Sequence, residues 1–393
     1  MLSRLKRFLF GIPIRSEHAH HERLTKFLAL PVFSSDALSS VAYGTEEILR
    51  VLVLCIPFAM SWNQVDLSTL EKLIPISIGI AVLLIIVVIS YIQTIFAYPG
   101  GGGSYIVSSE NLGSVFGRIA GGSLLIDYTL TVAVSISAGV AAIVSAFPGL
   151  SGLAVEIALA LLAMITWANL RGVRESGAIF ALPTYSFIVG IFIMLGVAFW
   201  KFVIMGQTPA IPHNISPAEI LPTVSKAVEP ITLFFLLRAF SAGCTALTGI
   251  EAISDGVAAF RKPESRNAAI TLGAMGSLLV VMFLGISWLA NFLHIMPITE
   301  GPHYQTVLSQ IARATLDSGG LYFFIQIATM SVLVLAANTA FADFPRLSYF
   351  MARDGFLPRQ LMAVGDRLVY QNGIVTLAAV AGFLIWTHEA NAH

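Results

Sequence analysis

Nine long apolar segments recur along this sequence, and they constrain its fold more than any other feature. Each is about 20 residues long, the length that an α-helix needs to cross the hydrocarbon core of a bilayer. Only 11% of the residues are charged and the mean hydropathy is +0.83, whereas soluble proteins have about 25% charged residues. We therefore expect an all-α integral membrane protein. The expected spans are residues 28–54, 74–97, 119–147, 152–170, 178–204, 231–258, 268–292, 320–344 and 370–386.

The basic residues predict which side of the membrane each connection faces. Sixteen of the 22 Lys and Arg residues fall in the N-terminal segment or in the even-numbered connections, and four fall in the odd-numbered ones. Cytoplasmic loops carry an excess of Lys and Arg. We therefore expect a multi-pass protein of the plasma (inner) membrane with a cytoplasmic N-terminus. The basic, amphipathic stretch before the first span is expected to contact membrane lipid.

The first span contains a polar stretch, SSDALSSVAYGTEE, that begins at Ser34. A carboxylate inside a span costs about 2.5–3.5 kcal/mol on insertion scales, so Asp36 is a functional candidate. Asp36, Ser39 and Tyr43 are spaced by three or four residues, which places them on one helix face. Ser34 and Ser35 can hydrogen-bond backbone groups that a helix break leaves free, and we expect the break there.

The third span carries a second polar stripe on one helix face. Its members are Asp127, Thr131 and Ser135, spaced by four residues, with Tyr128 adjacent. Hydroxyl groups in membrane helices often bond only to their own backbone, so a purely structural role is an equal alternative for Thr131 and Ser135 taken singly. Asp127 requires a polar partner or a ligand, because a lone carboxylate is costly in the membrane.

The sixth span carries a third stripe, and its sequence repeats part of the first span. Thr245, Thr248, Glu251 and Asp255 follow helical steps of three, three and four, after an expected break at Ser241-Ala242-Gly243. The stretch DALSSV of the first span matches TALTGI of the sixth. Two interrupted helices five spans apart predict an inverted-repeat transporter with its binding site near the bilayer midplane.

A run of four glycines follows the second span, in the stretch YPGGGGSY from Tyr98 to Tyr105. No Lys-Ser/Thr pair follows it and no strand is expected before it, so a phosphate-binding loop is not indicated. Close backbone packing or a re-entrant turn is the expected role of these glycines.

Four stretches resemble the amino acid–polyamine–organocation (APC) superfamily and, within it, the KUP family of potassium importers. They are PVFSSDALSSVAYGTEEI, YPGGGGSY, IDYTLT and TGIEAISDG. The resemblance covers about residues 24–386 and implies a LeuT-type inverted-repeat core with broken first and sixth helices, potassium–proton symport and a homodimer. The GDIGTSPLY pattern of other KUP members is absent. Nine of the ten core helices are visible, so we expect a core that is incomplete at the C-terminus, with weak or no transport.

The resemblance and the stripes together define a substrate site and a division of the chain. On the resemblance, the potassium-site residues are Asp36, Tyr43, Asp127, Tyr128, Thr131, Ser135, Thr248 and Glu251; the stripes add Ser39 and Thr245. The direct potassium ligands expected among them are Asp36, Tyr43, Asp127, Thr131, Thr248 and Glu251, with Glu251 also the proton-coupling group. The expected parts are a basic N-terminal segment (1–26), a first five-helix repeat (27–205), an extracellular loop (206–230) and a second repeat with four helices (231–393).

The chemistry of the stripes favours a cation as the substrate. A dehydrated alkali ion needs several oxygen ligands, which hydroxyls, carbonyls and carboxylates supply. A proton-coupled amino acid permease is the alternative, because half-helix N-termini can hold a carboxylate, although three acids in the spans oppose it. An enzyme is not expected, since the spans lack a Ser/His/Asp or metal pattern; a non-transporting sensor remains open. We expect no cofactor besides transported K⁺ and H⁺, and zero net charge argues against nucleic acid.

Overall fold

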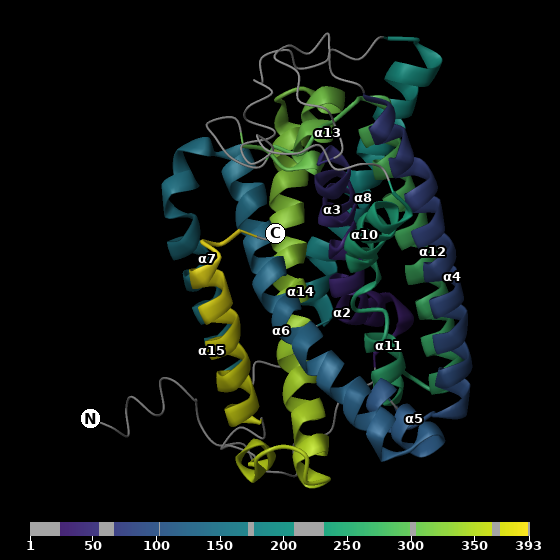
Figure 1. Ribbon diagram of the computed structural model, residues 1–393, viewed down its shortest axis with the longest axis vertical. Coiled ribbons are helices and arrows are strands. Elements are labelled where there is room, and N and C mark those ends of the chain that lie inside the picture. Colours follow the sequence, from purple (N-terminus) through teal and green to yellow (C-terminus); the bar gives the residue numbers. More distant parts are fainter. Residues whose placement is uncertain are drawn as a thin grey trace.

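The computed structural model describes residues 24–54, 67–101, 103–171, 177–207, 232–298, 304–363 and 370–391. Within these ranges, seven helices are long and apolar enough to cross a membrane, and they correspond to the second to eighth expected spans. The ninth expected span is a shorter apolar helix. The protein is therefore a multi-pass, all-α membrane protein (Figure 1). Most of the N-terminal segment 1–26 and of the loop 206–230 lies outside the described residues.

The structure describes thirteen α-helices. Their bounds are α2 Lys26–Ser39, α3 Val41–Val53, α4 Leu73–Ala97, α5 Gly103–Leu112, α6 Ser114–Ala146, α7 Ala154–Leu170, α8 Gly177–Ala198, α10 Leu233–Gly243, α11 Ala252–Asp255, α12 Glu264–Phe292, α13 Val307–Leu316, α14 Gly320–Arg353 and α15 Gln371–Thr387.

The first span is interrupted as predicted, but at a different residue. It consists of α2 and α3, which are separated at Ser40. The break expected at Ser34 and Ser35 is wrong, because both residues lie inside α2. The hydroxyl of Ser40 instead donates to the carbonyl of Ala37, at 2.6 Å. Such local side-chain bonds compete with helix hydrogen bonds, which explains an interruption at this serine.

The sixth span is interrupted more deeply than the first. The break expected at Ser241–Gly243 begins later, because these residues form the last turn of α10. A 3₁₀ turn follows, and the backbone is unwound from Thr248 until α11 begins at Ala252. Gly249 has φ +75°, a conformation that glycine adopts without steric cost. The continuous helical stripe expected from Thr245 to Asp255 is therefore wrong.

Elements that are five spans apart in the sequence lie against each other. α3 packs against α10, α4 against α12, α6 against α14, and α7 against α15. Figure 1 shows the α4–α12 pair at one edge of the bundle and the α7–α15 pair at the other. Such pairing is expected when two halves of a transporter are related by an axis that runs between them.

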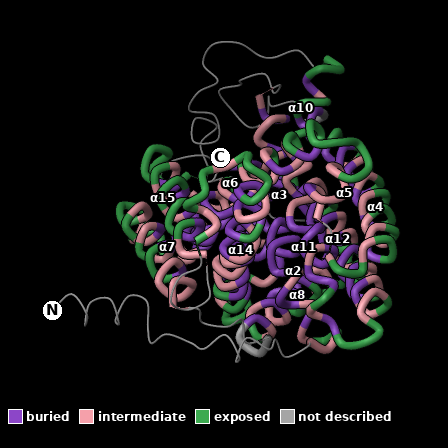
Figure 2. Tube along the Cα trace, turned by 90° about the horizontal axis from the view of Figure 1, so that it is seen from below, coloured by how far each residue is buried: buried purple, intermediate pink, exposed green. Residues whose placement is uncertain are grey.

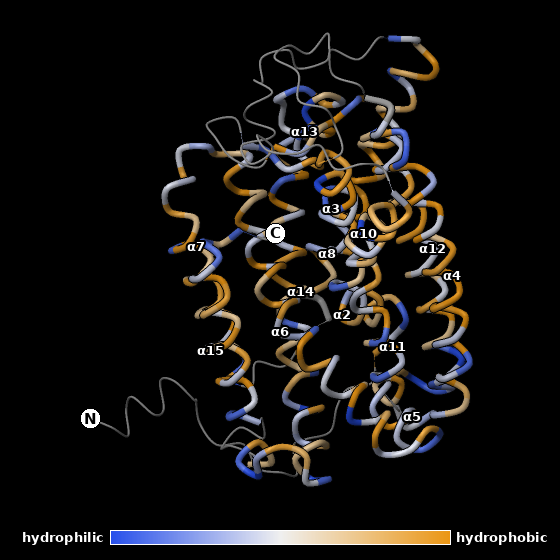
Figure 3. The backbone as a smooth tube through the Cα atoms, viewed as in Figure 1, coloured by the Kyte–Doolittle hydropathy of each residue, from blue (hydrophilic) through white to orange (hydrophobic). Residues whose placement is uncertain are grey.

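The buried interior contains polar as well as apolar side chains, whereas the outer surface is mainly apolar. In Figure 2, α2 and α11 lie among the buried elements in the middle of the bundle, whereas α4, α7 and α15 carry exposed residues at its edge. Figure 3 shows mainly apolar residues along the outer helix α4. Its outer face consists of large aliphatic side chains that are 47–58% exposed, namely Ile78, Val82, Ile85, Ile86 and Ile89. A continuous apolar face of this kind suits contact with lipid.

Candidate functional site

The interruptions of the first and sixth spans meet inside the bundle. The Ser40 hydroxyl lies 3.2 Å from the carbonyl oxygen of Ala246 and donates a hydrogen bond to it, although the two residues are 206 positions apart. Close approach is possible because Gly44 has no side chain: a Cβ there would lie 3.0 Å from the Cβ of Ala246. The structure thus brings together the two interrupted spans that the repeated sequence singles out.

Asp36 lies at this junction with an unsatisfied carboxylate. Its residue is 3% exposed, and its Oδ1 atom has no hydrogen-bond partner among the described residues. The carboxylate lies against the unwound backbone of the sixth span, since a Cβ at Gly249 would be 2.7 Å from the Asp36 carboxyl carbon. Buried polar atoms are normally hydrogen-bonded. The free oxygen of Asp36 therefore indicates a position for a positively charged or hydrogen-bonding ligand.

Hydroxyl groups of both interrupted spans lie at this junction. The phenol of Tyr43 on α3 interacts with the Thr248 side chain in the unwound segment, so these two residues are placed together as expected. The hydroxyls of Ser39, Thr245 and Thr248 donate to the backbone carbonyls three residues earlier, at 2.8, 3.0 and 3.1 Å. Those bonds provide a structural reason for the three hydroxyls, while their lone pairs remain available.

The third-span stripe lies on α6 as predicted. Tyr128, Thr131 and Ser135 are buried, with exposed fractions of 4%, 6% and 0%. The hydroxyl oxygen of Ser135 has no hydrogen-bond partner among the described residues, so it is a second unsatisfied oxygen in the interior. Asp127 is only partly buried, yet its charge is close enough to act on Asp36. α6 therefore adds both a carboxylate and free hydroxyl oxygen to the interior.

Glu251 lies at the end of the unwound segment, immediately before α11, and is 7% exposed. Its carbonyl accepts a hydrogen bond from the backbone N–H of Asp255. The charges of Asp255, Asp127 and Asp36 act on its side chain, so the three predicted acids and Asp255 lie in one neighbourhood. Within the described part of the chain, however, no three acidic, His or Cys side chains are grouped closely enough to hold one metal ion. The three carboxylates do not share one coordination shell in this conformation.

Two glycines of the run, Gly101 and Gly103, lie against Asp255 at the end of α11, as expected for close backbone packing. A Cβ at Gly101, where φ is +81°, would lie 2.5 Å from the Asp255 carbonyl oxygen, and one at Gly103 would lie 3.2 Å from a carboxylate oxygen. The following helix, α5, is anchored by Tyr105, whose hydroxyl donates to Asp354 at 2.6 Å. Burial and this carboxylate raise the pKa of Tyr105 to about 12, so the phenol keeps its proton.

Two charged pairs, one of them with an exposed arginine, Arg346, are not among the residues that the stripes select. Asp343 and Arg346 on α14 form an ion pair at 3.7 Å. Glu46 and Arg50 on α3 form another at 3.1 Å, and Glu46 is 1% exposed. The sequence contains a signal for the second pair, because Glu46 and Arg50 continue the helical spacing of Tyr43.

Comparison with known proteins agrees with this arrangement. Residues 53–392 match the amino acid permease family. The chain is 48% identical over 385 residues to the potassium transporter KimA of Bacillus subtilis (strain 168). The match covers 98% of this chain and 60% of that relative, so the chain spans less than two thirds of the relative's length. Nine expected spans, two interrupted helices that meet at a buried acid, and the family match lead to one conclusion: this chain belongs to the amino acid permease family of the APC superfamily.

Proposed function

We propose that this protein is a secondary active transporter that imports potassium together with protons across the bacterial inner membrane. The observation that carries the proposal is the free carboxylate oxygen of Asp36 at the meeting point of two interrupted spans. A monovalent cation would satisfy this oxygen, and the neighbouring hydroxyl and carbonyl oxygens can replace its water shell. The similarity to a Bacillus subtilis relative that is a potassium transporter supports the same substrate.

The proposed ligands come from three elements. Asp36 and Tyr43 belong to the first span, Thr248 and Glu251 to the unwound part of the sixth, and the Asp127–Ser135 stripe to α6. Because the three acids do not share one shell, we propose successive cation positions rather than a single cage. Asp36 and Asp127 act as ligands in this scheme, and Glu251 carries the coupled proton.

The wider architecture belongs to the same proposal. The packing of the first four spans against the spans five positions later supports a LeuT-type inverted repeat. We propose that the N-terminus is cytoplasmic, that the protein acts as a homodimer, and that its outer apolar face contacts lipid. No cofactor and no nucleic acid take part.

Uptake of rubidium, a potassium substitute, tests the substrate. The full-length protein in liposomes should accumulate radiolabelled rubidium, and an inward proton gradient should increase the rate. A panel of amino acids provides the comparison, because the chain belongs to the amino acid permease family. Accumulation of an amino acid in place of rubidium would overturn the cation assignment and favour the alternative substrate.

Single cysteines test the proposed topology. In a protein whose Cys55 and Cys244 are replaced by serine, a cysteine next to Arg171 or Arg261 should react only with reagents on the cytoplasmic side. A cysteine next to Lys201 serves as the control and should react only from outside. Membrane-impermeant maleimide on intact cells distinguishes the two faces. Labelling at Arg261 from outside would contradict the orientation and the span assignment.

A further inference from the structure

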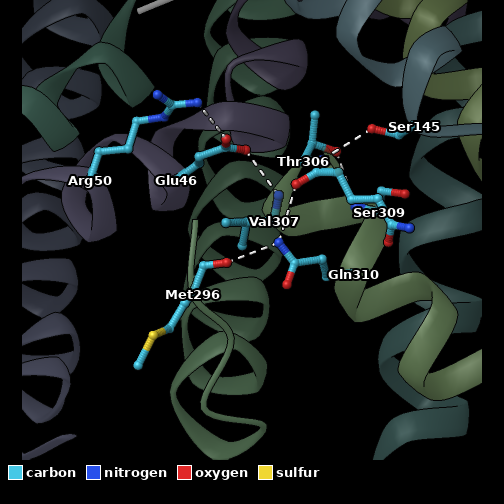
Figure 4. Close-up of polar contacts among 9 residues, drawn as sticks. Glu46, Arg50, Ser145, Met296, Thr306, Val307, Ser309 and Gln310 are labelled. Carbon is cyan, nitrogen blue, oxygen red and sulfur yellow. Dashed lines mark hydrogen bonds and ion pairs between the residues drawn. The ribbon is translucent and has the colours of Figure 1, made fainter. Parts of the chain in front are cut away.

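A second polar cluster lies on α3, one helical turn beyond Tyr43, where the helix meets the start of α13 (Figure 4). Glu46 is buried there and uses both of its carboxylate oxygens. Oε1 lies 3.1 Å from the Arg50 guanidinium, and Oε2 accepts a hydrogen bond from the backbone N–H of Val307 at 2.9 Å. Glu46 thus links α3 to the first residue of α13.

Several polar bonds hold the start of α13 against the transmembrane helices. The Ser309 hydroxyl in its first turn is hydrogen-bonded to the Tyr322 hydroxyl of α14, at 2.8 Å. The N–H of Thr306, the residue before the helix, donates to the Ser145 hydroxyl at the end of α6, at 3.1 Å. Gln310 donates to the carbonyls of Met296 and Gln305, in the connection that leads from α12. The hydrogen bond from the Val307 N–H to the Glu46 carboxylate joins the first turn of α13 to α3 of the interrupted first span (Figure 4).

A small hollow lies beside the hydrogen bond between Glu46 and Val307. Its volume is about 20 Å³, which is room for about one water molecule. Its polar lining consists of Tyr43, Glu46, Thr306 and Thr329, and the rest of the lining is alanine and leucine. Tyr43 also faces Thr248 of the interrupted spans, so the hollow adjoins the candidate ion site. An alkali ion that has lost its water is of similar size and prefers such oxygens.

We propose that Glu46 is an outer cation-binding residue and that α13 closes this position by competing for the same carboxylate. While α13 is docked, Val307 and Arg50 occupy both carboxylate oxygens, so neither oxygen is available to a cation in the hollow. When α13 moves away, Oε2 loses its donor and can bind an entering cation together with the hydroxyls of Tyr43 and Thr329, which belong to α3 and α14 and stay in place. When the cation passes to Asp36, Glu46 can bind Val307 again. This inference rests on the proposed transport of potassium from the side on which α13 lies.

Two substitutions distinguish the role of the Glu46 charge from the role of its hydrogen bond to α13. Glu46→Gln keeps an oxygen that can accept from Val307 but removes the negative charge. Val307→Pro removes the donor and keeps the charge. Proline is tolerated at the first position of a helix, and Thr306, with ψ 153°, already has the extended conformation that a residue before proline prefers. Val307→Ala keeps the N–H and is the matched control.

Two measurements on the full-length protein distinguish these variants. The first is the KM for rubidium uptake into liposomes. The second is the rate at which a membrane-impermeant thiol reagent labels a single cysteine at Ala141, which lines the hollow, in a background without Cys55 and Cys244. Labelling does not depend on transport.

Glu46→Gln should raise the KM for rubidium about tenfold, the effect of losing one charged ligand, while Ala141→Cys stays as protected as in the parent protein. Val307→Pro should increase the labelling rate about tenfold and leave the KM near that of the parent. Val307→Ala should behave like the parent. Glu46→Asp, whose shorter side chain keeps the charge but does not reach Val307, should reproduce the proline variant if the latter folds poorly.

The outcomes separate this inference from the proposed function. An unchanged KM in Glu46→Gln overturns the outer cation position. Labelling that stays slow in both Val307→Pro and Glu46→Asp overturns the closure by α13. If the parent protein takes up no rubidium, but Val307→Pro still exposes Ala141→Cys, then the proposed function fails and the closure stands.

Discussion

Asp36→Asn should reduce the affinity for rubidium at least about 100-fold, as expected when a buried cation loses its charged ligand. Asparagine has nearly the same shape as aspartate, so the change removes the charge without altering the packing against Gly249. Equilibrium binding of radiolabelled rubidium to the purified full-length protein measures this effect directly. Binding is the proper measurement because uptake also depends on later steps.

Thermal unfolding provides the check on folding. Removal of a buried, unpartnered charge should leave the unfolding temperature of Asp36→Asn unchanged or raise it, since burial of an unpaired carboxylate costs free energy. Ser34→Ala is the matched control: its hydroxyl lies in the same helix but donates to the Leu30 carbonyl, so rubidium affinity should stay within about twofold. An affinity of Asp36→Asn equal to that of the parent protein would show that Asp36 is not a ligand.

Glu251→Gln should bind rubidium but lose the stimulation of uptake by an inward proton gradient. A carboxyl group can take up and release a proton during each cycle, whereas an amide cannot. Glu251 is suited to this role because it is buried, lies between the unwound segment and α11, and has Asp255, Asp127 and Asp36 as acidic neighbours. The ratio of uptake rates with and without the gradient should fall to about one in the variant.

Asp255→Asn is the comparison that makes this result specific. Asp255 lies four residues further along and is enclosed by the glycine turn at Gly101 and Gly103. If Glu251 is the coupling group, Asp255→Asn should keep its response to the proton gradient. Full proton-driven uptake by Glu251→Gln, or loss of the response only in Asp255→Asn, would assign proton coupling to another residue.

Features that depend on local sequence could be predicted from the sequence alone. The spans follow from length and hydropathy, because a helix in lipid must satisfy its own backbone and cover itself with apolar side chains. Asp36, Asp127 and Glu251 can be selected from the sequence because acidic residues in membrane spans are energetically costly and are usually functional. The repeated stretch in the first and sixth spans indicates two interrupted helices, and both are present.

The exact form of each interruption was decided by tertiary structure. The sequence predicts the break at Ser34 and Ser35, but Ser39 and Ser40 carry the same hydroxyl group. Ser40 differs because its hydroxyl reaches a backbone carbonyl of the other interrupted span, that of Ala246, whereas the distant partner of Ser35 is the Thr339 hydroxyl on α14. The unwound turn at Gly249 likewise lies against the Asp36 side chain of the other span. The positions of the breaks thus depend on contacts that appear only when the two spans meet.

Glu46 illustrates the same division. Its spacing from Arg50 can be read from the sequence, and this i,i+4 ion pair forms as local geometry requires. Its second partner, the N–H of Val307, is 261 residues away, and backbone N–H groups carry no residue-specific signal in a sequence. The sequence by itself therefore determined the membrane spans, the buried acids and the local pairs. Tertiary structure alone decided which distant backbone groups those acids meet, because such contacts depend on how the helices pack.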